Sequence, residues 1–167
     1  FNSGIIKKVR NDIKNLQNSG KTVKLLIVGD KGVESLTKEH SSIIEKTYNY
    51  GENSVYSISL QIKDEIIELV TNGKIGSTDL YYNKFKNVIT QISTKAHLLP
   101  VRGFDKEDID GANKISEYEY EGEHTIYDAI NLYVNGQINY ALLQSKASEE
   151  AARMTAMDNA TKNAEDL

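Results

Sequence analysis

The chain has 167 residues, of which 39% are hydrophobic and 26% charged, and this composition is typical of one globular domain of ordinary size. Its 20 basic and 24 acidic residues are interspersed and give a net charge of -4, which argues against a nucleic-acid-binding protein. The absence of Cys excludes disulfides and thiolate zinc sites, and no apolar run reaches the ~18 residues that a membrane-spanning helix needs.

The first half of the chain alternates predicted helices and strands. Apolar residues recur at intervals of three and four in the helical stretches, and Gly20 and Gly73 follow two of them as stop signals. This alternation is typical of an α/β domain with a parallel or mixed sheet. Helices are predicted over 5–16, 33–40 and 59–72, strands over 22–28 and 55–58, and a loop over 48–54.

A change of pattern follows at residue 79. Residues 79–85 are apolar and aromatic, and residues 88–98 alternate between two faces, so the pair predicts a long strand or a hairpin. Pro100 ends it, because proline cannot donate to a strand ladder. Residues 102–114 predict an acidic loop, and residues 116–120 predict an edge strand with a charged face.

A single long helix is predicted from residue 124 to residue 167. Its first half carries bulky apolar residues and is expected to dock on the domain, with Gly136 as a candidate kink, while its second half is expected to leave the domain. Small side chains bury too little area to hold a lone helix, so this half requires a partner helix. The small apolar stripe consists of Ala147, Ala151, Met154, Met157, Ala160 and Ala164, widened by Ala152 and Ala156.

Both ends of the sequence lack the usual signals. Phe1 stands where Met is expected, and residues 163–167 contain neither Gly nor Pro nor a basic last turn. We therefore expect a piece of a longer protein whose other parts supply the partner helix.

Two loops deserve comparison with known ligand-binding motifs. Residues 29–32, Gly-Asp-Lys-Gly, follow a strand and precede a helix, but they lack the spacing of a phosphate-binding loop, which favours a tight turn. Residues 106–117 align with a calcium-binding loop, yet Lys106 occupies the first ligand position and would repel the ion. A solvated acidic loop is the favoured interpretation.

The remaining ionisable residues give no recognisable catalytic or metal-binding pattern. His40, His97 and His124 lie in separate segments without a neighbouring ligand motif, so surface or structural roles are expected. On the final helix, Glu149 with Arg153 and Asp158 with Lys162 are four residues apart, and each pair is expected to contribute ~0.3 kcal/mol. These charges form either a solvated face or a subunit contact.

Residues 148–164, SEEAARMTAMDNATKNA, resemble the C-terminal signature of the gamma subunit of F-type ATP synthases. FNSGI at residues 1–5 is similar to the segment after the family's glycine-rich motif, VGDKG at 28–32 resembles its turn, and YNKF at 82–85 resembles one of its strands. The resemblance covers the whole chain. Together with the pattern above, it predicts an α/β fold: a Rossmann-like three-layer domain with a central mixed sheet over 1–123, and a projecting helix over 124–167 that belongs to an antiparallel coiled coil.

The resemblance also implies a function. The chain would be a rotor shaft without bond chemistry, with no catalytic, cofactor-binding or metal-binding residues. Its partners would be the alpha, beta and epsilon subunits and the membrane proton-translocating ring, so it would lie peripherally on the inner, energy-transducing membrane, on the cytoplasmic or matrix side. The residues expected to contact other subunits are Glu149, Arg153, Met154, Met157, Asp158 and Lys162.

Two other functional classes remain open on the residues alone. A Rossmann-like enzyme would require a phosphate loop and paired titratable groups, and neither occurs at recognisable spacing. A non-enzymatic interaction module that dimerises through its Ala-rich C-terminal helix fits the small-residue stripe equally well.

Overall fold

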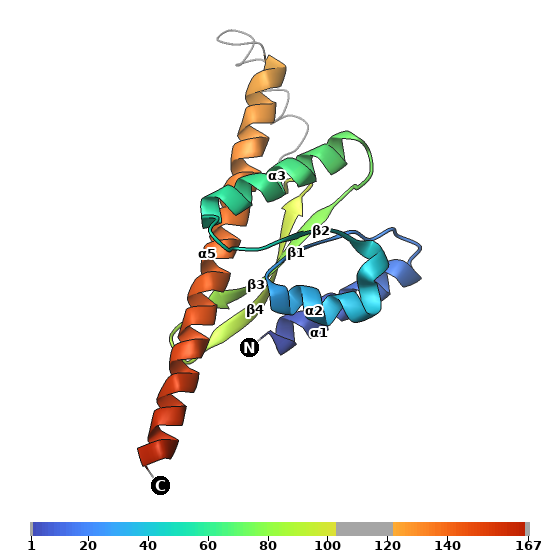
Figure 1. Ribbon diagram of the computed structural model, residues 1–167. Helices are drawn as coiled ribbons and strands as arrows, with labels where there is room; N and C mark the ends of the chain where they lie inside the picture. Colours follow the sequence, from blue (N-terminus) through green and yellow to red (C-terminus); the bar gives the residue numbers. More distant parts are fainter. Residues whose placement is uncertain (1, 103–121, 166–167) are drawn as a thin grey trace.

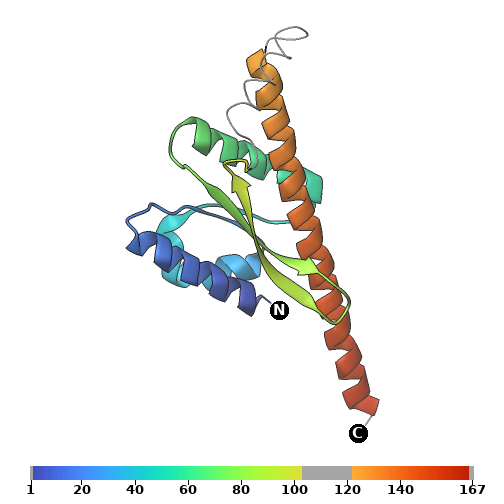
Figure 2. The same ribbon diagram turned by 180° about the vertical axis from the view of Figure 1, so that it is seen from behind.

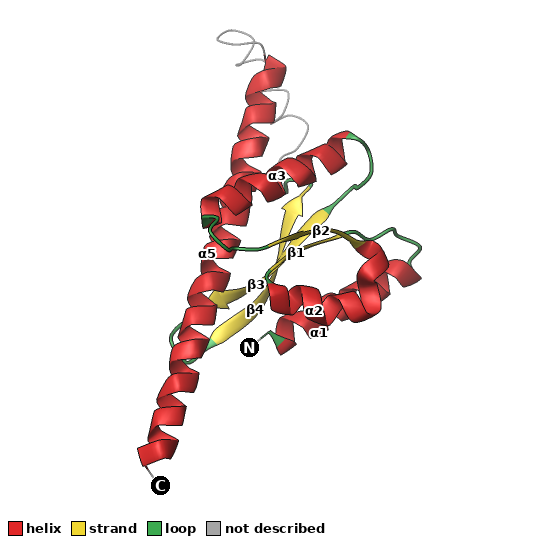
Figure 3. Ribbon diagram, viewed as in Figure 1, coloured by secondary structure: helices red, strands yellow, loops and turns green. Residues whose placement is uncertain are grey.

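The computed structural model describes residues 2–102 and 122–165, and the side chains of 122–124 are not described. Helices and strands alternate through the first half of the chain and are followed by a hairpin and one long helix (Figures 1 and 3). The elements are α1 (Ser3–Asn18), β1 (Leu25–Val28), α2 (Asp30–His40), the 3-10 turn η1 (Ser41–Ile43), β2 (Ile44–Tyr48), α3 (Val55–Thr71), β3 (Thr78–Phe85), β4 (Gln91–Leu99) and α5 (Gly122–Glu165).

Strands β1 and β2 form a parallel pair connected through α2. Gly29 directs the chain from β1 into α2 with a φ of 99°, a conformation that residues with a Cβ rarely adopt. Its N–H donates to the Tyr48 carbonyl at 2.9 Å, so the turn is also fixed to the end of β2. The predicted tight turn between strand and helix is therefore confirmed.

The predicted hairpin is also confirmed. β3 and β4 pair antiparallel, with Tyr82 opposite Thr94. In the turn, the Asn87 side-chain oxygen accepts hydrogen bonds from the N–H groups of Ile89 and Thr90, as asparagine often does in turns. β4 ends immediately before Pro100, as expected.

Residues 55–58 were expected to form a strand, and this prediction was wrong because they are the first turn of α3. Ser54 caps that helix, its side chain accepting from the Ser57 N–H at 3.1 Å. Ile58, 1% exposed, then begins a buried stripe at helical spacing. Helix capping and tertiary burial thus outweigh the weak strand preference of Val55 and Ile58. The stripe continues through Ile62, Ile66 and Leu69.

The α/β class is confirmed. Where one central mixed sheet was expected, the described residues form two separate two-stranded sheets, one parallel and one antiparallel. The hairpin lies between α5 on one side and α1 with α2 on the other (Figure 2). The apolar core joins α3, α5, β2 and β4, which makes α5 part of the domain's interior. Its buried members are Tyr48, Ile58, Ile62, Ile66, Leu98, Leu99, Val134, Ile138 and Leu142.

Helix α5 has 44 residues and extends well beyond the rest of the molecule (Figure 1). It passes through Gly136 without a break. Within the described part of the chain, no helix combines the length and the apolar character needed to cross a membrane.

Candidate functional site

The long helix α5 is the candidate site, and its first part is seated on the domain by apolar contacts. Val134 is fully buried, Ile138 is 2% exposed, and Ala151 is the last strongly buried residue at 4%. Beside them, Asn135 accepts a hydrogen bond from the buried Ser59 hydroxyl of α3 at 3.1 Å. This seat fixes the helix against α3 and the hairpin.

Polar side chains of α5 also reach the backbone of β3. The Asn83 N–H donates to Ser145 Oγ at 3.3 Å, and the Ser148 hydroxyl donates to the Asn83 carbonyl at 3.0 Å. The Phe85 N–H donates to Gln144 Oε1 at 2.9 Å. No sequence pattern pointed to these residues, because their partners lie 59 to 65 positions away in the chain.

Within the described residues, the last hydrogen bond from α5 to another part of the chain lies at the hairpin turn. The Thr155 hydroxyl donates to the Val88 carbonyl at 3.0 Å. Beyond it, every residue of 156–165 is exposed. The predicted small-residue stripe is therefore divided: Ala151 packs on the domain, whereas Ala160 and Ala164 face solvent.

The residues predicted to contact other subunits all lie on exposed surface of α5. Glu149 and Arg153 form an ion pair at 3.1 Å, and Asp158 and Lys162 form another at 3.2 Å, so both predicted pairings are confirmed. The Met154 and Met157 side chains are 60% and 64% exposed. Exposed pairs of this kind contribute only ~0.3–0.5 kcal/mol each, which leaves these charges available to an incoming partner.

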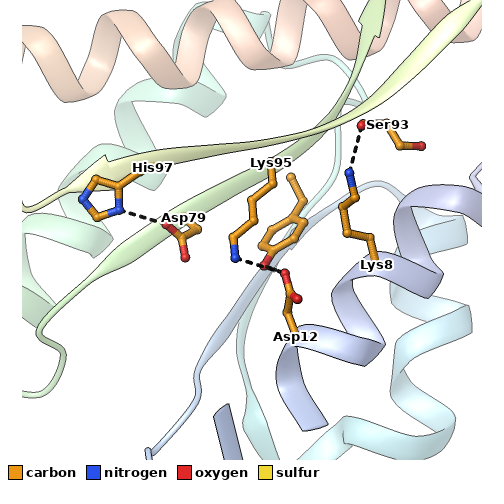
Figure 4. A network of polar contacts seen from close by, with 7 residues as sticks. Lys8, Asp12, Asp79, Ser93, Lys95 and His97 are labelled. Carbon is orange, nitrogen blue, oxygen red and sulfur yellow. Dashed lines mark hydrogen bonds and ion pairs between the residues drawn. The ribbon is translucent and has the colours of Figure 1, made fainter. Parts of the chain in front are cut away.

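A polar network ties α1 to the hairpin on the far side from α5 (Figure 4). Asp12 accepts a hydrogen bond from the Tyr81 hydroxyl and lies 3.2 Å from Lys95 Nζ. The Tyr81 bond is the largest influence on Asp12 and Lys95 adds to it, so the pKa of the carboxyl is lowered despite partial burial. Burial first, and then Asp12, raise the pKa of Tyr81.

Close approach of α1 makes a second bond to the hairpin possible. Lys8 Nζ donates to the Ser93 carbonyl at 3.2 Å (Figure 4). A Cβ at Gly4 would lie 2.9 Å from Ser93 Oγ, so a larger residue where α1 begins would displace the Ser93 hydroxyl. The start of the chain is thereby held against β4.

The histidines occupy structural positions where the structure describes them. His97 lies between Asp79 Oδ1, 3.1 Å from Nδ1, and the Pro100 carbonyl, 2.7 Å from Nε2. His40 Nε2 is 3.9 Å from Glu39. In residues 2–102 and 125–165, no group of three or more ionisable side chains is arranged to hold a metal ion. The predicted strand 116–120, most of the loop 102–114, the loop 106–117 and the His124 side chain lie outside the described residues.

The amino-acid sequence was compared with protein families and with known proteins. The family model described as ATP synthase matches residues 1–167. The chain belongs to the gamma-chain family of the ATP synthases. It is 48% identical to the ATP synthase gamma chains of Rickettsia felis and Rickettsia canadensis, covering all of this chain and 57% of each relative. The chain therefore spans little more than half the length of these members of the family.

Solved structures agree with the family in fold. The central stalk and c-ring structure of Tetrahymena thermophila mitochondrial ATP synthase contains a chain similar to this one, with a TM-score of 0.69 at 25% identity. That similarity covers 93% of this chain and 69% of the other. The rotor of Euglena gracilis mitochondrial ATP synthase gives a TM-score of 0.62 at 18% identity, covering 92% and 61%. The arrangement of a small domain on a long helix is thus shared with rotor subunits.

Proposed function

We propose that this chain is the part of an ATP synthase gamma chain that joins the globular base of the rotor to its shaft. The observation that carries the proposal is α5, a continuous helix whose buried residues lie between Val134 and Ala151 and which is exposed over 156–165. A helix held firmly along part of its length and free beyond it can transmit rotation from a base to a distant site. The match of the ATP synthase family model to residues 1–167 supports placing this helix in an ATP synthase.

The partners follow from that role. The exposed end of α5 would lie within the hexamer of alpha and beta subunits, and the globular part would contact the epsilon subunit and the membrane proton-translocating ring. The protein would then lie peripherally on the energy-transducing membrane through its complex, on the cytoplasmic or matrix side. Rotation of the ring would change the shape of the nucleotide sites of the alpha and beta subunits.

The two regions of the chain would divide this work. Residues 1–123 would form the globular domain, and residues 124–167 the helix, whose second half would join an antiparallel coiled coil. The separation of the helix into a docked part and a free second half is supported by the burial pattern of α5, which changes from buried to exposed near Thr155. Neither region would perform bond chemistry, so the chain would be a non-catalytic subunit.

The contact surface proposed on α5 combines charge with flexible apolar side chains. Arg153 is the strongest candidate, because its guanidinium makes directional bonds to carboxylates and its side chain is 62% exposed even while paired. Met154 and Met157 offer an adaptable apolar surface beside it. The full proposed set is Glu149, Arg153, Met154, Met157, Asp158 and Lys162.

The test is reconstitution of the full-length chain with the alpha and beta subunits. ATPase activity that depends on the chain, together with co-purification of the complex, is the expected result. Arg153→Glu should weaken this dependence, whereas Lys14→Glu, an equal charge reversal at an exposed position of α1, should not. A folded chain that fails to assemble with these subunits would reject the proposal.

Self-association through the exposed face of α5 is the competing function, favoured by the small residues that remain uncovered over 156–165. It predicts a mass that rises with concentration and a dimer that is lost on truncation after Ser145. Ala160→Glu offers a milder version of the same test, because the residue is exposed and the substitution preserves helix propensity. A monomer at all concentrations would exclude this alternative.

A further inference from the structure

The edge of β3 that faces away from β4 is occupied by side chains of α5. In an antiparallel pair, alternate residues point their N–H and C=O groups to opposite edges of the strand. Asn83 and Phe85 are two apart and both turn their backbone groups toward α5, where Ser145, Ser148 and Gln144 bind them. A helix here takes the place that a neighbouring strand would fill.

These bonds differ in how far they are shielded from solvent. The bond from Ser148 to the Asn83 carbonyl is buried, since Ser148 is fully buried and Asn83 is 5% exposed, whereas the Ser145 bond is partly buried and the Gln144 bond is exposed. Solvent cannot readily replace the Ser148–Asn83 bond if the two residues separate. A buried N–H or C=O that loses its partner bears the full cost of desolvation. The position of α5 on the hairpin is therefore defined by directional contacts and not by apolar packing alone.

Directional contacts distinguish one rotational position of a helix from the next. Apolar packing is non-directional, so bulky residues alone tolerate small turns of α5 about its axis. A shift by one residue would rotate the contacting face by about 100° and remove all three bonds together. The spacing 144, 145 and 148 places the three side chains on one face, which makes them act as a unit.

Asn83 extends the connection beyond α5. Its side-chain amide donates to Asn2 Oδ1 at 3.5 Å, next to the start of α1, and its side-chain oxygen accepts from the Ser93 hydroxyl of β4 at 3.4 Å. One residue thus links α5 to β4 and to the beginning of the chain. A rotational force on α5 would reach both through the Asn83 backbone.

We propose that Gln144, Ser145 and Ser148 form a torsional lock that fixes the rotational phase of α5 relative to the globular domain. This proposal rests on the proposed rotor function. It adds that torque passes between the shaft and the base at the contact of α5 with β3. Its physical content is that α5 cannot turn on the hairpin without breaking hydrogen bonds to the β3 edge. The apolar core residues of α5 hold the helix on the domain, and the three hydrogen bonds fix its rotational position.

The experiment uses the full-length chain in the complete synthase, reconstituted into vesicles. Two rates are measured, ATP hydrolysis and ATP-driven proton pumping, and their ratio reports how faithfully rotation is transmitted. Gln144→Met removes the acceptor for the Phe85 N–H at a partly exposed position, and Gln144→Glu retains an acceptor. The variant that combines Ser145→Ala with Ser148→Ala removes the other two bonds.

The lock predicts that the pumping-to-hydrolysis ratio falls in Gln144→Met and in the double variant, while Gln144→Glu keeps it. A single net hydrogen bond corresponds to roughly a two- to tenfold change in the population of the seated helix, so the fall grows with the number of bonds removed. Leu142→Val is the control for general loosening, because Leu142 is buried in the same helix but lies outside the lock.

Two outcomes would overturn the lock: an unchanged ratio in all lock variants, or an equal fall in Leu142→Val at matched thermal stability. Failure of the unsubstituted chain to assemble with its partners would instead reject the rotor function itself. The two failures are therefore distinguishable. Gln144→Met keeps the test valid even if the double variant does not fold, because Gln144 is partly exposed.

Discussion

Lys95 Nζ of β4 lies 3.2 Å from Asp12 Oδ2 of α1, and the Tyr81 hydroxyl of β3 donates to the same carboxylate. Helix α1 and both strands of the hairpin, which is distant from α1 in sequence, thus meet at one side chain that is 26% exposed. Hydrogen bonds to a charged acceptor are stronger than neutral ones, so this carboxylate contributes more to the packing of α1 than an exposed ion pair does.

Asp12→Ala should lower the free energy of unfolding by ~1–3 kcal/mol, because it leaves the Tyr81 hydroxyl and the Lys95 ammonium without their shared acceptor. Asp158→Ala is the matched control, since Asp158 is also a helical aspartate paired with a lysine but is 64% exposed. Its effect should remain within ~0.5 kcal/mol. Urea denaturation measures both, and equal losses would contradict the assigned role of Asp12.

The stability contributed by Asp12 should also depend on acid. Its folded-state pKa is lowered from the ordinary value of 3.8, chiefly by the Tyr81 hydroxyl and further by Lys95. The folded state therefore binds fewer protons, and the stabilisation is present above pH ~4 and is lost as the pH falls through the lowered pKa. The free energies of unfolding of wild type and Asp12→Ala, measured from pH 7 downwards, should converge. A difference that stays constant with pH would contradict this.

Tyr48 should produce the opposite dependence in alkali. Burial, with a smaller effect of Glu65, raises its pKa from 10.0 to about 12. The neutral phenol is thus favoured in the folded state, and its contribution is complete below pH 10 and lost as the pH rises towards 12. Relative to wild type, Tyr48→Phe should gain ~1–2 kcal/mol of stability between these limits.

A comparison at neutral pH completes the Tyr48 test. Among the described residues, the buried Tyr48 hydroxyl has no hydrogen-bond partner, so Tyr48→Phe should leave stability at pH 7 unchanged or slightly higher. Tyr56→Phe is the control, because it removes the same hydroxyl from a tyrosine that is 58% exposed. If the stabilities of wild type and Tyr48→Phe changed in parallel as the pH rises, the effect of burial on Tyr48 would be refuted.

Leu98→Ala and Leu132→Ala compare one residue type in two environments. Leu98 is 1% exposed in the core between the hairpin and α5, and Leu132 is 74% exposed on α5 itself. The first should destabilise the protein by ~2–5 kcal/mol and the second by less than ~0.5 kcal/mol. Thermal unfolding gives the ranking, and similar losses would mean that Leu98 is not part of the core.

Two glycine substitutions should have opposite signs. Gly136 lies inside α5 with open space where a Cβ would be, so Gly136→Ala should stabilise the helix by ~0.5–1 kcal/mol. Gly29 has a φ of 99°, so Gly29→Ala should destabilise by ~1–2 kcal/mol even though space is available. The urea concentration at the midpoint of unfolding measures both changes in stability. A lower midpoint in Gly136→Ala would indicate that α5 needs its flexibility there.

The sequence predicted best where periodicity is long. The stripe from Ile62 to Leu69 and the alternation before Pro100 identified α3 and β4, because each pattern repeats over several turns or pairs. β2 was missed, since three of its five residues are exposed and two of them are Glu45 and Lys46. The four residues 55–58 were misassigned because short apolar segments fit a strand and a helix equally well.

The candidate site divides in the same way. The Glu149–Arg153 and Asp158–Lys162 pairs were visible because spacing along one helix fixes which side chains meet. The bonds of Gln144, Ser145 and Ser148 were not visible, because they depend on where the backbone of β3 lies in the folded chain. Serine and glutamine on a helix otherwise resemble any solvated surface.

The occupied edge of β3 has one more consequence, which concerns solubility. An exposed strand edge is a template on which another chain can add a strand, and such pairing is a common route to aggregation. Ser145 and Ser148 are bound to the Asn83 N–H and carbonyl, so an incoming strand would have to displace α5 before it could pair there. The helix that leaves the domain therefore also shields this part of the hairpin from unwanted β-pairing during the life of the protein.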